Sequence, residues 1–166
     1  MNYLFLPLPV GHPAGILKNL KKKKNHIPGS LIISTYLTMK TTDERVEKKG
    51  LKDSLPEILS FENQFQGYKI TIVIPEYTSL CPKTGQPDFG TITVEYQPDT
   101  FVIELKSFKI YIQSYRNLGI FYENAVNRIL DDIVCAIKPK WAKVKGEFRP
   151  RGGIHSVIEA SYPRCS

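Results

Sequence analysis

The hydrophobic residues of this chain follow two different periods, and this change of period constrains the fold most. Residues 68–76, "YKITIVIPE", and residues 90–99, "GTITVEYQPD", carry a hydrophobic residue at every second position. The inward positions of these segments are Ile70, Ile72, Ile74, Ile92, Val94 and Tyr96. Because side chains alternate between the two faces of a strand, both segments are predicted to be strands with one buried face.

Residues 118–139, "LGIFYENAVNRILDDIVCAIKP", follow the helical period instead. Hydrophobic residues recur at Val126, Ile129, Leu130, Ile133, Val134 and Ile137. The opposite side carries Asn127, Arg128, Asp131 and Asp132. This spacing predicts an amphipathic helix with one face on a core. Lys138 and Pro139 are expected to end it, since proline cannot continue a helix.

The remaining segments complete the pattern. Residues 101–113, "FVIELKSFKIYIQ", are interpreted as a third extended segment. Residues 141–148 and 153–162 are predicted to be two further strands, separated by "RPRGG". Residues 53–65 are expected to form a short helical turn or a loop.

This order of elements indicates an α+β domain in which helix covers one face of an antiparallel sheet. The sequence shows no internal repeat, and residues 41–166 are expected to form a single domain. Few residues remain to cover the other face of the sheet, which suggests that subunits cover one another.

The positive charge is concentrated in the first 40 residues. Six of the 23 lysines and arginines lie there without any acidic residue, and the remaining 17 face 16 acidic residues, a net charge of +1. The body of the chain therefore lacks the charge typical of nucleic-acid binding. Residues 1–40 are expected to be a disordered extension, or to precede a true start at Met39. A patch at residues 21–24 for RNA or a membrane is the alternative.

Neither a membrane span nor a secretory signal is predicted near the start of the sequence. The hydrophobic residues 1–17 are interrupted by prolines and glycines, and the positive charges follow them. The cysteines number three, which is odd, and they lack metal-ligand spacing. This usage favours a reduced, cytoplasmic protein.

One short stretch, "SLCPKTGQPDFG", predicts a reactive pair. Cys81 and Asp88 flank a turn in which Pro82 and Pro87 restrict the backbone and Gly85 permits the reversal. The thiol and the carboxyl group are therefore expected to lie near one another with little freedom.

Four separated motifs, "CPKTGQPDFG", "IELKSFKIY", "FYENAVNRILDD" and "PRGGI", give the chain a resemblance to a known family. In this order and spacing they resemble the NADPH-dependent nitrile reductases that convert 7-cyano-7-deazaguanine to 7-aminomethyl-7-deazaguanine in queuosine biosynthesis. The resemblance is to the short, single-module branch and covers residues 61–158. It implies the tunnelling fold (T-fold), with subunits in pentameric rings stacked as decamers and active sites at subunit boundaries.

The resemblance implies that Cys81 is the nucleophile and Asp88 the proton donor. A thiolate adds readily to a nitrile carbon to give a covalent thioimide, whose nitrogen must be protonated. The alternatives are an inert core cysteine and a turn-forming aspartate. Cys135 and Cys165 are interpreted as structural.

The resemblance implies substrate recognition by the start of the predicted helix and by residues 103–105. Glu123 would accept hydrogen bonds from the deazaguanine ring, although a glutamate there also complements a helix dipole. Ile103, Glu104 and Leu105 would touch the substrate, from another subunit if the site is shared. Tyr122 stands where many relatives have histidine, and its high usual pKa makes it a poor proton shuttle.

Lys106, Lys109 and Arg151 are implied to hold the phosphates of NADPH, the expected cofactor; surface lysines exposed to solvent are the alternative. In an extended segment the two lysines would point to opposite faces unless it bends.

Three rivals remain. The amidine-forming relative, which adds ammonia to the same nitrile on tRNA, generally lacks the lysine motif. A zinc-dependent GTP cyclohydrolase would need ligands that His12, His26 and His155 do not supply with the cysteines. A non-catalytic binding module would be expected to have lost Cys81 or Asp88.

Overall fold

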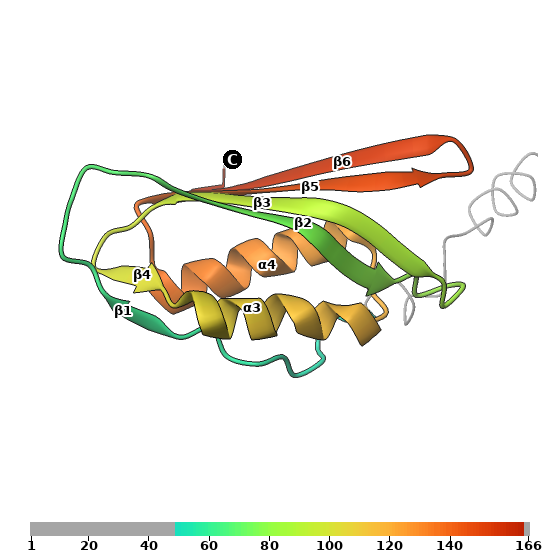
Figure 1. Ribbon diagram of the computed structural model, residues 1–166, viewed down its shortest axis with the longest axis horizontal. Helices are drawn as coiled ribbons and strands as arrows, with labels where there is room; N and C mark the ends of the chain where they lie inside the picture. Colours follow the sequence, from blue (N-terminus) through green and yellow to red (C-terminus); the bar gives the residue numbers. More distant parts are fainter. Residues whose placement is uncertain (1–48, 165–166) are drawn as a thin grey trace, which may run out of the picture. The chain divides into compact units, whose positions relative to one another are not determined.

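The structure is a computed structural model that describes residues 49–164. In this part of the chain a four-stranded antiparallel sheet is covered on one face by two helices (Figure 1). The predicted extension over residues 1–40, with its lysine patch and Met39, and Cys165 lie outside the described residues. None of the helices from residue 49 to residue 164 is long and apolar enough to cross a membrane.

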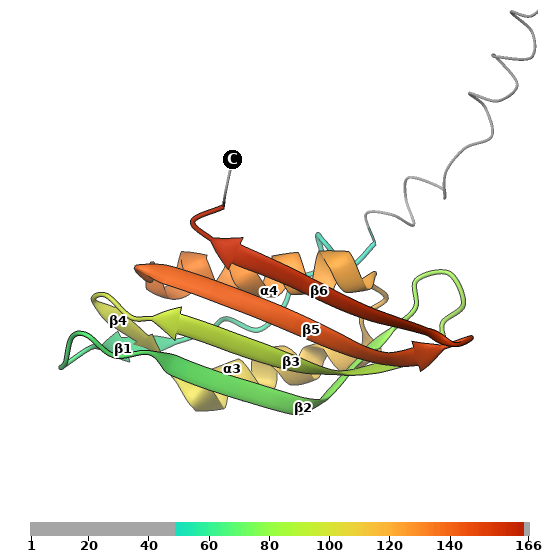
Figure 2. The same ribbon diagram turned by 90° about the horizontal axis from the view of Figure 1, so that it is seen from above.

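The strands lie side by side in the order β2-β3-β5-β6 (Figure 2). Their bounds are β2 (Ile70–Leu80), β3 (Pro87–Gln97), β5 (Trp141–Arg151) and β6 (Ile154–Tyr162). Ile92, Val94 and Tyr96 of β3 are at most 1% exposed, so the predicted inward stripe is confirmed. The four strands predicted at residues 68–76, 90–99, 141–148 and 153–162 are all present.

The first half of β2 also follows its predicted alternation, and a β-bulge then changes it. Ile74 pairs with Ile92, but the next pair is Tyr77 with Gly90, so β2 contains one extra residue. Because the bulge absorbs this residue, Tyr77 and Ser79 face the core after it, each 1% exposed.

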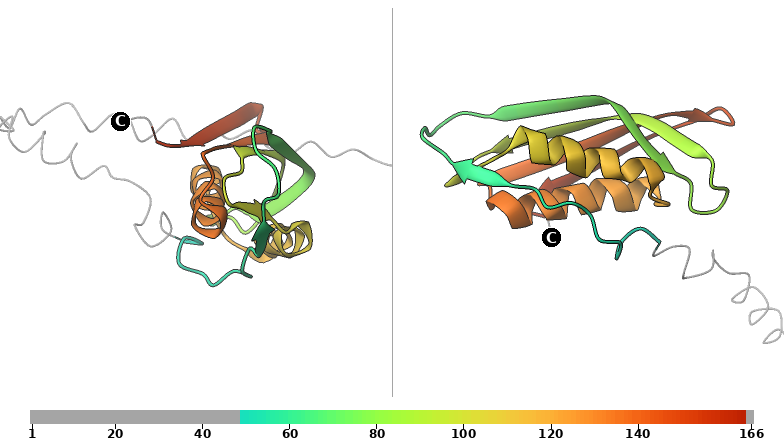
Figure 3. Two further views of the ribbon diagram at one scale, coloured as in Figure 1. Left: turned by 90° about the vertical axis from the view of Figure 1, so that its left-hand side faces the viewer. Right: turned by 60° about the horizontal axis from the view of Figure 1, so that its bottom comes forward.

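The long predicted helix is confirmed as α4 (Tyr122–Ile137). Its hydrophobic stripe is buried except for Val134, which is half-buried. The helix is capped by Lys138, whose left-handed backbone (φ 43°) precedes Pro139. Both helices lie on the same side of the sheet (Figure 3). The α+β class with an antiparallel sheet and helices on one face is therefore confirmed.

The prediction of an extended segment over residues 101–113 was wrong. Only β4 (Phe101–Ile103) is extended, and it pairs with β1 (Ser60–Glu62) in a separate two-stranded sheet. The chain then forms α3 (Leu105–Ser114) and a short 3-10 helix, η1 (Tyr115–Asn117). Residues 53–65 form a loop and β1, without a helical turn.

The cause of this error is a sequence that fits both periods. Phe108, Ile110 and Ile112 alternate as in a strand, yet the structure buries Phe108 and Ile112 and leaves Ile110 48% exposed. The Glu104 side chain starts the helix by accepting hydrogen bonds from the backbone N–H groups of Lys106 and Ser107, at 2.7 and 2.6 Å.

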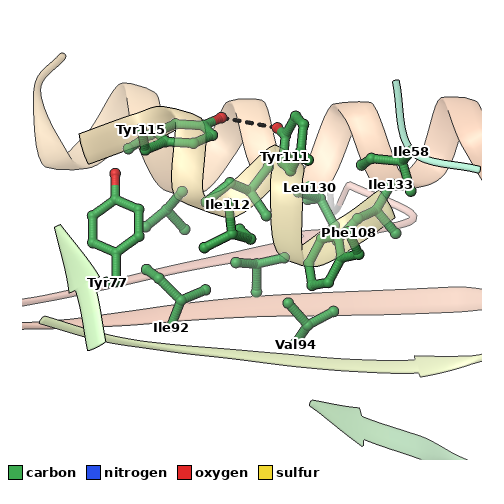
Figure 4. Packing of buried hydrophobic residues seen from close by; sticks show 14 of the residues in the cluster. Ile58, Tyr77, Ile92, Val94, Phe108, Tyr111, Ile112, Tyr115, Leu130 and Ile133 are labelled. Atoms are coloured by element: carbon green, nitrogen blue, oxygen red, sulfur yellow. Dashed lines mark hydrogen bonds between the residues drawn. The ribbon is translucent and has the colours of Figure 1, made fainter. Parts of the chain in front are cut away.

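The core lies between the sheet and the two helices (Figure 4). It contains Tyr77, Ile92 and Val94 from the sheet, Phe108, Tyr111 and Ile112 from α3, Tyr115 from η1, and Leu130 and Ile133 from α4. The Tyr111 and Tyr115 hydroxyls are 2.8 Å apart, and the Tyr111 hydroxyl donates to Asp132.

Candidate active site

The turn between β2 and β3 places Cys81 and Asp88 at one end of the sheet. The Cys81 N–H donates to the Gln86 carbonyl and the Gly85 N–H to the Cys81 carbonyl, both at 2.8 Å. Gly85 has a φ of 69°, a conformation that favours glycine. Ser79 pairs with Asp88 on the neighbouring strand, so the carboxyl group lies beside the end of β2. The predicted juxtaposition of the thiol and the carboxyl group thus has a structural basis.

Two main-chain hydrogen bonds attach the segment before α4, residues 118–120, to the same end of the sheet. The Leu80 N–H donates to the Leu118 carbonyl at 2.9 Å, and the Ile120 N–H donates to the Leu80 carbonyl at 3.0 Å. Tyr122 and Glu123 follow this segment at the start of α4. Residues far apart in the sequence are therefore held next to Cys81 by main-chain hydrogen bonds.

These elements surround a cavity of about 280 Å³. Five predicted site residues line it, namely Cys81, Asp88, Tyr122, Glu123 and Arg151. Phe121, Ile154 and Ser156 also line it and were not predicted. The alternation of β6, which places Ile154 and Ser156 on one face, was the signal that could have found two of them.

The surroundings of Cys81 favour a reactive thiol. Partial burial opposes ionisation, but hydrogen bonds from the Thr84 hydroxyl and from the backbone amides of Thr84 and Lys83 outweigh it, so the pKa of Cys81 is lowered from its usual value. The negative charge of Asp88 acts in the opposite direction. The side chain is half-buried and lines the cavity, as a nucleophile requires.

Asp88 is the buried carboxyl group of the site, with 4% of the residue exposed. The Tyr122 hydroxyl donates to its Oδ1 at 2.7 Å, and Arg151 Nη1 lies 3.1 Å from the same oxygen. Arg151 Nη2 also donates to the Pro87 carbonyl at 2.8 Å. A hydrogen-bond donor and a cation from distant elements thus hold the carboxyl group from one side.

Tyr122 is held in place by its ring as well as its hydroxyl. The ring stacks on Phe148 of β5, with centroids 3.9 Å apart and an interplanar angle of 13°. Burial, followed by the hydrogen bond to Asp88, raises the pKa of Tyr122 to about 12. The hydroxyl therefore remains a neutral donor at ordinary pH.

The predicted residues at the start of α3 lie away from this cavity. Ile103 is buried in the core, whereas Leu105 is 60% exposed. Hydrogen bonds from the backbone amides of Ser107 and Lys106 lower the pKa of Glu104, whose carboxylate caps the helix.

Lys106 and Lys109 are both exposed, three residues apart on α3. Residues at this spacing are neighbours on a helix, so the expectation that they point to opposite faces was wrong. Lys109 lines a second cavity of about 280 Å³, between α3 and β2. Between residues 49 and 164, no three His, Cys, Asp or Glu side chains form a group that could hold a metal ion.

Comparison with known proteins identifies close relatives. The profile of the family described as "QueF-like protein" matches residues 87–166. A protein of Elusimicrobium minutum named "NADPH-dependent 7-cyano-7-deazaguanine reductase" is 56% identical over 118 residues, which cover 70% of this chain and 89% of the relative. A protein of the same name from Chloroherpeton thalassium is 56% identical over 110 residues, 64% of this chain and 95% of the relative.

A solved structure supports the fold. The archaeosine synthase QueF-Like in the apo form superposes with a TM-score of 0.55 at 24% identity, covering 58% of this chain and 95% of that one. This likeness concerns the fold alone. The sequence relatives show that the chain belongs to the QueF-like protein family of the 7-cyano-7-deazaguanine reductases.

Proposed function

We propose that the protein is an NADPH-dependent oxidoreductase that reduces the nitrile of 7-cyano-7-deazaguanine to the aminomethyl group, in tRNA queuosine biosynthesis. The names of its relatives support this reaction. The observation that carries the proposal is the cavity in which Cys81, with a lowered pKa, lies with the buried Asp88. A nucleophile and a proton donor are the two groups that addition to a nitrile needs.

In the first step Cys81 adds to the nitrile carbon. A bond forms between sulfur and carbon, one bond of the carbon–nitrogen triple bond is lost, and the thiol proton passes to the nitrogen through Asp88. The product is a thioimide, so no external oxidant or reductant is used. Tyr122 and Arg151 hold Asp88 for this transfer, and Tyr122 acts only as a donor to the carboxyl group.

NADPH, when bound, supplies the two hydrides that convert the thioimide, and then the imine left when the carbon–sulfur bond breaks, to the amine. Asp88 delivers a proton to the nitrogen in each reduction, and Cys81 leaves as a thiolate between them. Lys106 and Lys109 suit the phosphates of the cofactor because they are exposed cations one turn apart on α3. Arg151 is the third proposed contact.

Glu123 is proposed to select the deazaguanine ring. It lies in the first turn of α4, is exposed, and lines the cavity beside Cys81. A carboxylate there can accept two hydrogen bonds, from the ring amide and the exocyclic amine. Ile103, Glu104 and Leu105 are proposed to complete the substrate site from a second subunit.

An active site formed by two subunits would explain why, within one subunit, the predicted residues at the start of α3 lie away from the cavity that contains Cys81. Among the described residues, β2 and β6 are the edges of the four-stranded sheet and have no partner strand on their outer sides. We propose that these edges join subunits into pentameric rings, stacked as decamers, with active sites at the boundaries. We also propose that residues 41–166 are one catalytic domain in the cytoplasm, without direct contact to nucleic acid.

The test is NADPH absorbance in the presence of 7-cyano-7-deazaguanine. We expect two NADPH oxidised per nitrile, complete loss of this activity in Cys81→Ala, and normal activity in the matched control Cys135→Ala, because Cys135 is exposed on α4 outside the cavity. A wild-type protein that forms a covalent adduct but leaves NADPH unchanged would instead favour the amidine-forming reaction.

A further inference from the structure

Two hydroxyl groups of β2 are buried next to Asp88 without a hydrogen-bond partner. Tyr77 and Ser79 are each 1% exposed, and neither hydroxyl is paired with any described protein atom. Buried hydroxyls nearly always have a partner in the protein or in ordered water, and an unpaired one destabilises the fold. These two groups therefore need an explanation.

Both hydroxyls face the same side of the sheet as the Asp88 carboxyl group. Ser79 is the direct cross-strand partner of Asp88, a position in which Cβ atoms lie about 5 Å apart. Tyr77 is two residues away on the same face of β2, opposite Gly90. Its ring meets Phe148 edge-on at 6.0 Å, and Phe148 is the residue on which Tyr122 stacks.

The electrostatics agree with this convergence. Burial raises the pKa of Tyr77, and the nearby Ser79 hydroxyl lowers it in part, although the two groups lack the geometry of a hydrogen bond. The charge of Asp88 also raises the pKa of Tyr77. Two hydroxyls and one carboxyl group thus supply three polar partners, about the number that a buried water molecule contacts.

We propose that Tyr77, Ser79 and Asp88 bind one ordered water molecule between their side chains, and that the two hydroxyls thereby act as positioning residues for Asp88. The inference rests on the proposed function, in which Asp88 transfers the proton between Cys81 and the nitrile. The water donates a hydrogen bond to the carboxylate of Asp88. The Oδ1 of this carboxylate already accepts a hydrogen bond from Tyr122 and forms an ion pair with Arg151. Donors to a carboxylate favour its ionised form.

This arrangement has a consequence for the pH dependence of addition. Cys81 and Asp88 must share one proton for the thioimide to form, so the reaction slows at acidic pH when the pair takes up a second proton. Loss of the water would make that second protonation easier. The acidic limb of the rate profile would then move to higher pH.

The experiment measures covalent adduct formation by intact-protein mass spectrometry, with 7-cyano-7-deazaguanine and without NADPH, as a function of pH. We expect Tyr77→Phe and Ser79→Ala each to move the acidic limb up by about 0.5 to 1 pH unit, which slows addition roughly three- to tenfold on that limb. The double variant should show no larger shift than either single variant, because all three lose the same water. Ser79→Thr, which keeps a hydroxyl, should restore the wild-type profile.

The matched control is Tyr115→Phe. Its ring centroid lies 5.7 Å from that of Tyr77, and its hydroxyl is buried but paired with Tyr111. This variant should lose stability without moving the acidic limb. The proposal is overturned if Tyr77→Phe raises the melting temperature and leaves the limb unchanged, as removal of a simply unpaired hydroxyl would. A wild-type protein that forms no adduct at any pH would refute the proposed function itself.

Discussion

The start of β3 and the start of α3 each present a carboxyl group of the proposed site, Asp88 and Glu104, and the two groups have different roles. Asp88 is buried and receives its donors from α4 and β5, elements distant in the sequence. Glu104 accepts hydrogen bonds from the backbone N–H groups of Lys106 and Ser107, two and three residues later in the sequence. The first group is organised by tertiary structure and belongs to a cavity, whereas the second is already engaged in starting a helix. The groups proposed to react therefore lie together around Cys81, and the start of α3 offers mainly exposed cations.

The strongest test of this contrast is Asp88→Asn. The substitution keeps the shape of the side chain but removes the proposed proton transfer, so turnover should fall by about 10²- to 10⁴-fold. NADPH oxidation and adduct formation should both be affected, because Asp88 transfers the proton in the proposed first step. Asp132→Asn on α4 is the control, and it should leave both rates near wild type. Normal adduct formation in Asp88→Asn would show that another group supplies the proton.

The α3 lysines should affect only the steps that use the cofactor. Lys106→Ala and Lys109→Ala are each expected to raise KM for NADPH about tenfold, since each removes a proposed charge-assisted contact to phosphate. Adduct formation without NADPH should not change. Lys140→Ala, which removes an exposed lysine near Asp99, is the control. Equal slowing of adduct formation would mean that α3 acts on the nitrile step instead.

Tyr122→Phe should have a smaller effect. It removes the hydrogen bond to Asp88 Oδ1 but keeps the ring stacked on Phe148, and the ion pair of Arg151 with Asp88 remains. Activity is expected to fall by less than about tenfold, the effect of one hydrogen bond. Steady-state kinetics beside Cys81→Ala would measure this. A loss as complete as that of Cys81→Ala would give Tyr122 an essential role in proton transfer.

The smallest expected effect is that of Glu104→Gln on stability. Backbone amides of Ser107 and Lys106 lower the pKa of Glu104, so its charge stabilises the folded state above the usual glutamate pKa. This stabilisation is lost as the pH falls through the lowered folded-state pKa. Melting temperatures should therefore be higher for wild type than for the variant at pH 7, and should converge in acid. A difference that is constant with pH would contradict a charge-dependent cap.

The sequence predicted the elements whose periodicity is unambiguous. The stripe of β3 and the hydrophobic face of α4 each fit one period only, and both were found where expected. Residues 105–114 fit two periods, and the choice between them is made by the Glu104 cap and by burial against the sheet. Propensity and pattern cannot supply the second of these, because burial depends on the finished fold.

The site divides in the same way. Cys81 and Asp88 could be paired from the sequence because one short turn connects them. The ion pair of Arg151 with Asp88 and the stacking of Tyr122 on Phe148 join residues 26 or more positions apart, through strand pairing and helix docking. Sequence spacing contains no information about such contacts, so these roles emerged only with the structure.

The bulge in β2 also bears on how the length of this strand can vary among related chains. Between Ile74 and Tyr77, β2 contains one residue more than the paired segment of β3. Deletion of Pro75 or Glu76 would remove the extra residue and leave Tyr77 paired with Gly90. Deletion of Thr78 would instead shift the register of Ser79 and Cys81 relative to Asp88. Natural length variation should therefore be tolerated before Tyr77 and absent between Tyr77 and Cys81.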